Sequence, residues 1–486
     1  MTASGATMGW IELLDGLARP EADLRPIDLC LDSRQIHPGS VFVAVQGATD
    51  HGLRFVDQAL ANGAIAIIHD EHMLPPEGLP VPSVEVAGLD RHLAMLARRF
   101  WGESGNMDLV AVTGTNGKTS VAWLLAQALD GAMFGTLGIG RPQRQRPGTH
   151  TTPDVLSVHR ELARLAGEGI GSVVLEASSH ALAQKRLAGL DFSSAIFTGL
   201  GHDHLDYHCD LDAYFEAKAR LFSEFESTRQ IINLDNDRGR ELAERLAGSA
   251  GLIGYSLSGQ PKARAQLKVR RIDLSGLAAA LVVDGTEIQL ESSLLGRINL
   301  HNLAIVALEL HARGLSAQAV SQRVAELTPV PGRMQALTDG RGRLAVVDYA
   351  HTPDALENVL LSLRELGGEC LWCVFGCGGE RDQIKRPLMG RIAEALADRV
   401  ILTDDNPRAE DGTAIIRAIQ AGMRRPERSQ VVRDRAAAIR AALSESGRGD
   451  LVLVAGKGHE SEQIIGQQRL PFSDENVIRQ FMEEAA

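Results

Sequence analysis

Cysteine is scarce in this sequence, and the few cysteines follow no pairing pattern. The 486 residues include only five, at positions 30, 209, 370, 373 and 377. An odd number at uneven spacing excludes a disulfide framework, and with it the small secreted scaffolds that depend on one. Cys370 and Cys373 have the spacing of a redox or metal pair, but they lie in or beside an apolar segment, which favours buried cysteines.

The chain also has no excess of positive charge and no long apolar run. Lys and Arg number 50 against 62 Asp and Glu, which gives a formal net charge of −12. Without a basic tract, a nucleic-acid partner is disfavoured. No apolar stretch approaches the roughly 20 residues that cross a bilayer, so we expect no membrane insertion. Residues 1–8 lack the basic and apolar segments of a signal peptide, and we expect a cytoplasmic protein.

The most informative segment that is present runs from Leu109 to Ser120. A short apolar run suited to a buried strand breaks into a glycine-rich turn, and apolar residues at helical spacing follow. Gly114 and Gly117 would let backbone N–H groups point at an anion. Lys118 would add positive charge, and the Thr119 hydroxyl would ligate Mg²⁺. Position 112 holds valine where the strict P-loop spacing requires glycine, so the match is to a shorter variant. An ordinary strand–helix turn is the alternative, but the order of elements predicts a nucleoside triphosphate site.

A small α/β unit precedes this segment. Val41–Val45 and Ala64–Ile68 are expected to be strands, with a helical pattern between them. The loop Asp32-Ser33-Arg34 carries small polar residues of the kind that often grip a ligand. Plain turn chemistry explains them equally well.

Polar residues also mark the ends of elements after the phosphate loop. The Thr151-Thr152 pair precedes a helical pattern and would face an anion, although a solvated loop is the alternative. Ser172–Leu175 is expected to be a buried strand that ends at Glu176. We therefore expect this carboxylate to face the phosphate loop as a metal ligand.

A His/Asp cluster at residues 202–208 precedes a helix that is expected from about Asp212 to Phe225. Zinc is disfavoured because no Cys or His pair completes a tetrahedral set, and one histidine is expected at a magnesium site instead. Lys218 falls within the apolar stripe of the helix, where a snorkelling lysine is one interpretation. A partly neutral amine could instead react with carbon dioxide and become a carbamate that binds Mg²⁺.

The pattern then changes to antiparallel β structure and back to α/β. Three strands are expected at Leu267–Ile272, Leu277–Val283 and Glu287–Leu290, with Asp284-Gly285 as a hairpin turn. In the apolar helix that follows, Asn299, His301 or Asn302 could contact an adenine, although helix capping explains them too.

Four further strands, each ending in a polar motif, are expected in the last third of the chain. They are Leu344–Val347, Leu371–Phe375, Val400–Leu402 and Leu451–Val454. Helical patterns separate them, so they should form a parallel sheet whose polar ends converge on one edge.

Together these patterns predict an α/β protein of three domains. The first, residues 1–90, is a small α/β domain. The second, residues 91–330, is a P-loop-type domain with a mostly parallel sheet and a small antiparallel part. The third, residues 331–486, is Rossmann-like.

Several of these motifs together resemble those of the Mur ligases of bacterial cell-wall synthesis. Thr113–Thr119 and the Asp-Tyr-Ala-His-Thr-Pro segment at 348–353 resemble motifs shared widely in that superfamily, which includes folylpolyglutamate synthases. Asp405–Arg408 resembles a narrower motif, which marks the members that add diaminopimelate. The resemblance runs from Asp32 to Glu460, nearly the whole chain.

The resemblance implies ATP-dependent formation of an amide bond in peptidoglycan biosynthesis. ATP would phosphorylate the D-glutamate side-chain carboxylate of UDP-N-acetylmuramoyl-L-Ala-D-Glu, and the amine of meso-diaminopimelate would attack the acyl phosphate. ATP and Mg²⁺ are the implied cofactors, and we expect a monomer. A lysine-adding relative or a folylpolyglutamate synthase is the alternative. A catalytically silent nucleotide-binding regulator would need a damaged phosphate loop or metal site, and the sequence has neither.

The resemblance also implies which residues form each site. The UDP-substrate would be held by Leu31, Ser33, Thr151, Thr152, Ser178, Gln184 and Arg186. ATP would be held by Gly114, Thr115, Asn116, Gly117, Lys118, Thr119, Ser120, Asn302, Arg333, Asp348 and His351. Diaminopimelate would be held by Arg381, Asp405, Asn406, Pro407, Arg408, Gly456 and Glu460. The metal positions would be Thr119, Glu176, His204 and Lys218 as its carbamate, and the catalytic residues Lys118, Lys218, His204 and Glu176.

Overall fold

The computed structural model describes residues 8–21, 23–47, 49–102, 107–148, 150–201, 207–339 and 342–484. Two compact units make up the chain. Unit 1 comprises residues 1–111, 130–193 and 217–227, and unit 2 comprises residues 112–129, 194–216 and 228–486. Within the described ranges, no helix combines the length and apolar character that crossing a membrane requires.

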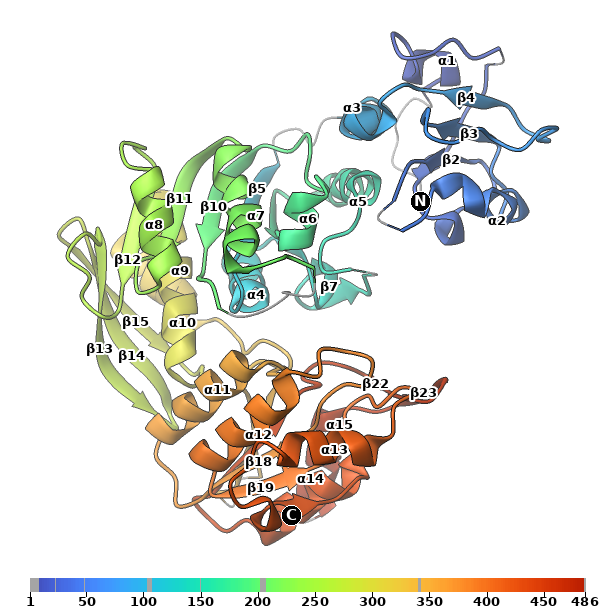
Figure 1. Cartoon of the computed structure of the whole chain (residues 1–486). Coiled ribbons are helices and arrows are strands. Elements are labelled where there is room, and N and C mark those ends of the chain that lie inside the picture. The colour runs from blue at the N-terminus through green and yellow to red at the C-terminus, as the bar shows by residue number, and fades with distance from the viewer. Residues whose placement is uncertain are drawn as a thin grey trace. The chain divides into compact units, whose positions relative to one another are not determined.

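Unit 1 begins with a four-stranded parallel sheet in the order β1-β2-β3-β4 (Figure 1). Its strands are β1 (Asp28–Cys30), β2 (Ser40–Ala44), β3 (Ala66–His69) and β4 (Ser83–Glu85). Its helices are α1 (Trp10–Leu13), η1 (Ser33–Gln35), η2 (Gly52–Phe55), α2 (Val56–Ala61) and α3 (Leu89–Trp101). β2 and β3 are close to the predicted strands, whereas α1 and β4 are too short to give a periodic signal in the sequence.

An eleven-stranded sheet follows in the order β15-β14-β13-β12-β11-β10-β5-β9-β6-β7-β8. Its first strands along the chain are β5 (Asp108–Thr113), β6 (Ala132–Gly135), β7 (Gly138–Arg141), β8 (Arg144–Arg146), β9 (Ser172–Glu176), β10 (Phe192–Phe197), β11 (Ser227–Asn233) and β12 (Leu252–Ser256). The helices along this part are α4 (Lys118–Ala128), α5 (Val155–Gly167), α6 (Ser179–Ala183), α7 (Leu211–Ser223), α8 (Asp237–Arg245), α9 (Arg297–Ala312) and α10 (Ala317–Ala325). β5 ends just before the glycine-rich turn and α4 begins directly after it, as the sequence predicted.

The far edge of this sheet is the predicted antiparallel part. It consists of β13 (Ala265–Asp273), β14 (Gly276–Val283) and β15 (Thr286–Ser292), which pair antiparallel in chain order. Asp284 and Gly285 have φ of 49° and 82°, and Val283 pairs with Thr286 across them. Positive φ at both central residues is what a two-residue type I′ turn requires, so the predicted hairpin is confirmed.

The C-terminal sheet has the order β16-β17-β21-β18-β19-β20. Its strands are β16 (Gln335–Thr338), β17 (Leu344–Asp348), β18 (Leu371–Phe375), β19 (Arg399–Leu402), β20 (Gln430–Val431) and β21 (Leu451–Ala455). Only β16 pairs antiparallel, so the predicted parallel sheet is confirmed. The chain ends with the hairpin β22 (Glu462–Ile465) and β23 (Gln468–Pro471) and the helix α15 (Asp474–Glu484).

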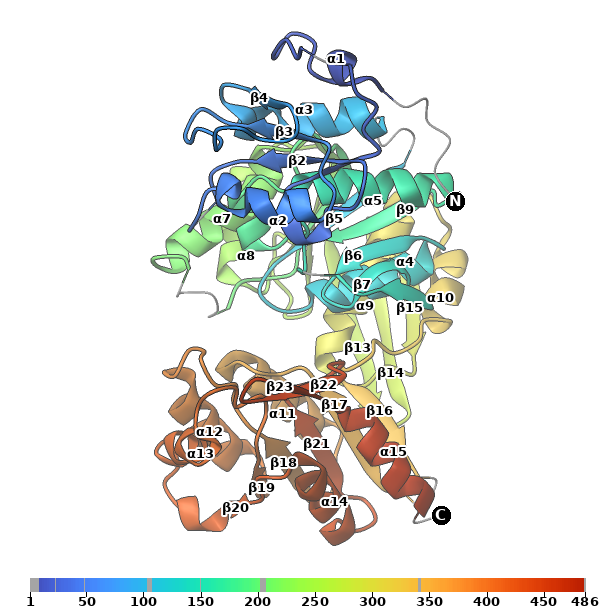
Figure 2. The same ribbon diagram turned by 90° about the vertical axis from the view of Figure 1, so that its right-hand side faces the viewer.

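Helices cover both faces of the C-terminal sheet, because its strands are apolar on both sides. On one face lie α11 (Pro353–Glu365), α12 (Lys385–Leu396) and α13 (Gly412–Gln420), which bury Leu360, Met389 and Ile416 against alternate strand residues such as Phe375 (Figure 1). α14 (Arg435–Glu445) and α15 cover the other face and pack against the remaining strand residues (Figure 2). A short 3₁₀ turn, η3 (Pro426–Arg428), precedes β20.

Candidate functional site: a phosphate loop and the ends of the C-terminal strands

The phosphate loop lies between β5 and α4 in unit 2. Gly114 has φ of 143°, and a Cβ atom there would lie 1.9 Å from Thr198 Oγ1. Gly117 has φ of 85° and precedes the first residue of α4. The Lys118 ammonium donates to the carbonyl oxygens of Gly114 and Thr115 at 2.9 and 2.8 Å. The lysine therefore folds over the loop and places its charge where an anion would meet the helix N-terminus.

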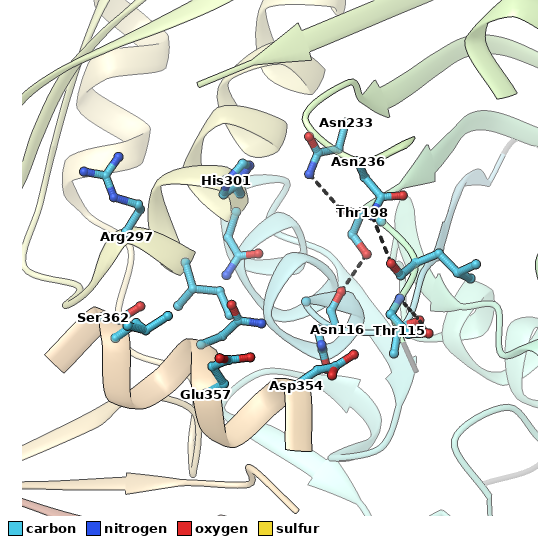
Figure 3. Close-up of a pocket in the computed structure, with 18 of the residues that line it drawn as sticks. Thr115, Asn116, Thr198, Asn233, Asn236, Arg297, His301, Asp354, Glu357 and Ser362 are labelled. Carbon is cyan, nitrogen blue, oxygen red and sulfur yellow. Dashed lines mark hydrogen bonds between the residues drawn. The ribbon is translucent and has the colours of Figure 1, made fainter. Parts of the chain in front are cut away.

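Thr198, directly after β10, holds the loop in this conformation. Its hydroxyl donates to Asn116 O at 2.6 Å (Figure 3). Its N–H donates to Thr113 O at 3.0 Å. Thr115 is held in a similar way, because its hydroxyl accepts from Gly201 N at 2.9 Å. The loop that the sequence predicted from its glycines is thus shaped by a segment more than 80 residues further along the chain.

A pocket of about 580 Å³ opens beside the phosphate loop (Figure 3). Thr115, Asn116 and Gly117 line one side, and His301 and Asn302 of α9 line another. The Asn302 side chain is held by a second asparagine of α9, because its Nδ2 donates to Asn299 Oδ1 at 2.9 Å. Pockets of this size hold a small cofactor, and a lining of both polar and apolar side chains fits a nucleoside.

Of the three α9 residues that were predicted to contact an adenine, two line this pocket and one does not. His301 and Asn302 line it, whereas Asn299 is not among the lining residues and donates to Leu295 O at 2.9 Å. Burial lowers the pKa of His301, so its imidazole is neutral near pH 7. The ring packs edge-on against Tyr255, with centroids 5.9 Å apart. Asn299 therefore supports Asn302 from behind, and the other two residues face the pocket.

Arg333 links the phosphate loop to the C-terminal sheet within unit 2. One of its Nη atoms donates to Thr119 Oγ1 at 3.4 Å, and its guanidinium carbon lies 4.5 Å from the centroid of the Tyr349 ring. His351 lies against the same ring, and its Nδ1 is 2.7 Å from Tyr349 O. The predicted ATP-binding residues Thr119, Arg333 and His351 are thus brought into one neighbourhood.

Asp348 is buried at the end of β17. Its carboxylate accepts from Met334 N at 2.7 Å and from Ala350 N at 2.8 Å. Burial raises the pKa of Asp348, and the charge of Arg333 opposes this shift. The side chain therefore fixes the turns on either side of Arg333 and Tyr349, and its assignment to ATP binding stays a prediction.

Glu176 and the residues predicted to hold the UDP-substrate gather in unit 1. The Glu176 side chain is fully buried, and its carboxylate accepts from Thr136 N at 2.8 Å. The Thr136 hydroxyl lies 3.1 Å from Thr151 Oγ1, and the Thr152 hydroxyl donates to Glu176 O at 2.5 Å. Ser178 N donates to Thr152 Oγ1 at 3.3 Å. The Glu176 carboxylate is thus held by Thr136, and the threonine pair lies beside it at the end of β9.

Arg186 and Gln184 complete this group of residues. Arg186 Nη1 donates to Thr152 O at 2.7 Å, and its Nη2 donates to Gln184 Oε1 at 2.7 Å. The same arginine contributes to lowering the pKa of His150, after the larger effect of burial. The positive charge lies beside the threonine pair, where the sequence predicted an anion.

Lys218 lies on α7 and is only 1% exposed. The interpretation as a snorkelling lysine with its amine in water is therefore wrong, because the side chain has almost no exposed surface. Tyr214, Phe215, Leu221 and Phe222 of the apolar stripe are all buried. His204 lies outside the described residues, so its predicted part in the metal site stays a prediction.

The loop that is predicted to hold the uridine end is fixed by its own side chains. Asp32 caps η1 by accepting from Arg34 N at 3.0 Å. The Ser33 hydroxyl donates to Gln58 Oε1 at 2.7 Å, and Leu31 packs against the core of the N-terminal sheet. Turn chemistry is present in this loop, and its role toward a ligand stays a prediction.

The polar ends of the C-terminal strands meet at one edge of the sheet, as predicted. Asn406 Nδ2 donates to Glu460 Oε2 at 2.9 Å, and Arg408 Nη1 donates to Gly379 O at 2.7 Å. A Cβ atom at Gly456 would lie 2.6 Å from Asp405 Oδ2, so glycine is needed there. Pro407 is buried, and Arg408 after it has φ of 52°.

These contacts divide the predicted diaminopimelate residues into two groups. Arg381 is exposed, and the guanidinium of Arg408 and the carboxylate of Glu460 are partly exposed. Asn406 is buried, and its amide donates to Glu460 on one side and accepts from Ile464 N at 2.9 Å on the other. The amide that the sequence assigned to the ligand thus orients its neighbours.

Models of one protein family match three successive segments of the chain. The model described as Mur ligase family, catalytic domain matches residues 29–101. The Mur ligase middle domain matches residues 112–309, and the Mur ligase, glutamate ligase domain matches residues 332–458. The chain belongs to the Mur ligase family.

Named relatives match nearly the whole length of this Mur ligase. The UDP-N-acetylmuramoyl-L-alanyl-D-glutamate–2,6-diaminopimelate ligase of Alkalilimnicola ehrlichii is 45% identical over 98% of this chain and 97% of its own. The protein of the same name from Pseudomonas aeruginosa is 45% identical over 93% of this chain and 94% of its own. The resemblance that the motifs indicated is therefore confirmed at the level of the family.

Solved structures of Mur ligases share the fold. A UDP-N-acetylmuramoyl-L-alanyl-D-glutamate–2,6-diaminopimelate ligase matches with a TM-score of 0.66 at 36% identity, over 94% of this chain and 95% of its own. A MurF ligase from Thermotoga maritima, solved in complex with ADP, matches with a TM-score of 0.64 at 20% identity, over 94% of this chain and 98% of its own. The second likeness concerns the fold alone.

Three residues of this Mur ligase that shape the sites were not selected from the sequence. Thr136 binds Glu176, Thr198 holds the phosphate loop, and Lys457 binds Glu460. Thr136 and Thr198 each follow an apolar strand directly, which is a signal that the sequence carries. Lys457 stands inside a motif that was recognised, between Gly456 and Glu460.

Proposed function

We propose that this Mur ligase adds meso-diaminopimelate to the D-glutamate side-chain carboxylate of UDP-N-acetylmuramoyl-L-Ala-D-Glu. ATP would phosphorylate that carboxylate, and the amine of diaminopimelate would displace the phosphate from the acyl phosphate. The amide bond then forms at the expense of ATP, in the cytoplasmic part of peptidoglycan biosynthesis.

The observation that carries this proposal is that Arg408 and Glu460, which carry opposite charges, both lie after strands of the C-terminal sheet and are connected through Asn406 and Ile464. Diaminopimelate carries a carboxylate beside its far amine, so a selective site needs a cation and an anion side by side. Arg408 offers a planar guanidinium that can bind a carboxylate through two N–H groups. Glu460, held to the Arg408 segment through Asn406, offers an acceptor for the ammonium.

The phosphate loop supplies the other half of the reaction. The transferring phosphoryl group would lie at the N-terminus of α4, where Lys118 and the loop N–H groups stabilise its charge. Arg333 would hold the Thr119 hydroxyl in place and add a second positive charge. The pocket beside the loop would receive the base, with His301 neutral and able to accept or donate a hydrogen bond.

The residues present fit Mg²⁺, which prefers oxygen ligands. Thr119 would hold one ion at the phosphate loop. Glu176, whose buried carboxylate is oriented by Thr136, and Lys218 as a carbamate would hold another. When bound, Mg²⁺ would neutralise phosphate charge and polarise the oxygens between which the phosphoryl group moves. In the same proposal Thr152, Ser178 and Arg186 bind the muramoyl-dipeptide, and Ser33 lies at the uridine end.

A phosphate-release assay with the purified full chain tests the proposal. ATP, Mg²⁺ and UDP-N-acetylmuramoyl-L-Ala-D-Glu are supplied with diaminopimelate, lysine or glutamate as the incoming amino acid. We expect release that depends on both the nucleotide substrate and diaminopimelate, with a tripeptide product of the corresponding mass. Faster release with lysine, or activity with a folate and glutamate, would overturn the choice of amino acid or of substrate class.

A further inference from the structure

A lysine lies buried beneath the predicted diaminopimelate site. Lys457, two residues after the end of β21, is 0% exposed. Its ammonium donates to Glu460 Oε2 at 2.7 Å and to Asn406 Oδ1 at 3.0 Å. A buried ammonium is costly unless it is paired, so these two contacts decide whether the charge is tolerated.

The two carboxylate oxygens of Glu460 differ in their hydrogen bonds. Lys457 Nζ and Asn406 Nδ2 both donate to Oε2. Throughout the described part of the chain, no hydrogen bond reaches Oε1, and the Glu460 side chain is 29% exposed. One oxygen is thus committed to the protein, and the other faces outward.

Lys457 also changes the charge that a ligand meets at Oε1. The carboxylate and the ammonium beneath it form a pair with no net charge, and the pair is shielded from water on its inner side. A ligand cation at Oε1 is therefore attracted by Glu460 and repelled by Lys457. Because the cation would be only a few ångströms further from the ammonium than from the carboxylate, the repulsion offsets much of the attraction. A ligand anion beside that cation is instead favoured by Lys457.

Arg408 is placed to receive such an anion. Its Nη1 is fixed by Gly379 O at 2.7 Å, and its backbone N–H donates to Ile464 O at 3.1 Å. Asn406 accepts from the neighbouring Ile464 N, so the Arg408 segment and the Lys457–Glu460 pair are held by the same short stretch of β22. The guanidinium and the outer oxygen of Glu460 thus belong to one connected assembly.

We propose that Lys457 is a specificity-determining residue that makes the site accept a zwitterionic side-chain end and discriminate against a lone cation. Lysine would bring only its ammonium to an already neutralised carboxylate. Diaminopimelate would bring an ammonium to Glu460 and a carboxylate to Arg408, and the charge of Lys457, which repels the ammonium, would attract the carboxylate. This inference rests on the proposed function and adds a reason for its choice of amino acid.

A purely structural role for Lys457 makes a different prediction. If the lysine only joined the segments that hold Asn406 and Glu460, its loss would loosen the site and weaken every amino acid alike. If its charge selects, its loss should strengthen the binding of a lone cation. A gain of affinity is a result that damage to the site does not produce.

The test is Lys457→Met in the full chain, with lysine measured as a competitive inhibitor against diaminopimelate. We expect the inhibition constant of lysine to fall at least tenfold, and the Michaelis constant for ATP to stay within twofold of the parent. Lys457→Gln, whose amide can still donate to Asn406 and Glu460, should behave like Lys457→Met, because it too lacks the charge. Lys457→Arg should retain the parent's selectivity.

Two further variants sharpen the result. Lys262→Met removes an exposed lysine that pairs with Glu244 at 2.9 Å, and it should leave the inhibition constant unchanged. In Lys457→Met/Glu460→Gln the gain for lysine should disappear, because the unbalanced carboxylate is gone. The proposal is overturned if the lysine constant of a folded Lys457→Met or Lys457→Gln variant is unchanged or higher. It is also overturned if both neutral variants fail to fold in thermal melting, which would leave only a structural role. A parent enzyme that does not use diaminopimelate would instead refute the proposed function.

Discussion

The guanidinium carbon of Arg333 lies 4.5 Å from the centroid of the Tyr349 ring, while the same side chain donates to Thr119 Oγ1 at 3.4 Å. A single arginine thus joins the first turn of α4 to the end of β17. A stacked guanidinium contributes about 0.5–2 kcal/mol when it is partly shielded from water.

Arg333→Met should therefore weaken nucleotide binding more than amino-acid binding. We expect the Michaelis constant for ATP to rise about tenfold, which corresponds to roughly 1.4 kcal/mol. The Michaelis constant for diaminopimelate should change by less than threefold. Arg440→Met, which removes an exposed ion pair with Glu484, is the matched control and should leave both constants unchanged. Equal effects of Arg333→Met on both substrates would contradict a specific role at the phosphate loop.

Lys118→Ala should abolish ligation and leave the protein folded. The lysine is partly exposed and donates to the carbonyl oxygens of Gly114 and Thr115, so its truncation removes charge at the loop without emptying an apolar core. Turnover by phosphate release and the melting temperature are the two measurements. Near-normal turnover would remove the phosphate loop from the mechanism.

Lys218→Ala should be inactive and partly rescued by a short carboxylate such as acetate or formate. Lys218 is buried on α7, and carbamylation would join its amine to carbon dioxide there. A carboxylate in the buffer would replace the carbamate as a metal ligand. Lys268→Ala, at an exposed position on β13, should be active without any rescue. A bare amine in a crystal structure with ATP and Mg²⁺ would refute carbamylation.

Arg408→Ala should raise the Michaelis constant for diaminopimelate at least tenfold and change that for ATP little. Loss of a charge-assisted bond to a ligand carboxylate costs on the order of 2–5 kcal/mol, and Arg381 should keep part of the binding. Initial rates with each substrate varied in turn give both constants. An unchanged value for diaminopimelate would remove Arg408 from the site.

The stability of the C-terminal sheet should fall in mild acid, partly because of His459. Burial and the nearby charge of Arg333 lower the pKa of His459 to about 4. The unfolded chain, with a histidine pKa near 6.5, then binds more protons than the folded chain between these values, so stability falls as pH decreases from about 6.5 toward 4. His459→Gln should lose less stability than the parent between pH 7 and pH 5 in urea unfolding. Equal losses in the two proteins would contradict this contribution.

The sequence predicted the elements whose signals are local. The strands β17, β18, β19 and β21 are short apolar runs between helical patterns, and their polar ends had to meet once the sheet was parallel. The β14–β15 hairpin followed from Asp284-Gly285, because few other residue pairs adopt positive φ twice in succession.

Roles that depend on partners distant in the chain could not be predicted in the same way. The resemblance of the motif at 405–408 assigned Asn406 to diaminopimelate, which stays a prediction, and nothing in the motif indicated that its amide bonds Glu460 and Ile464, more than 50 residues away. The enclosure of Lys218 likewise depends on how the helix packs, and the apolar stripe alone left two interpretations open.

Arg408 has the left-handed backbone conformation, with φ of 52°, that glycine adopts without strain. A residue with a side chain gives up about 1–2 kcal/mol of folding free energy there. Backbone conformation alone would therefore favour glycine at this position, although the Arg408 side chain recovers part of that loss by donating to Gly379 O. If Arg408 binds the incoming amino acid as proposed, thermal stability and amino-acid affinity oppose each other in the loop after β19, and selection for heat resistance alone would erode the affinity.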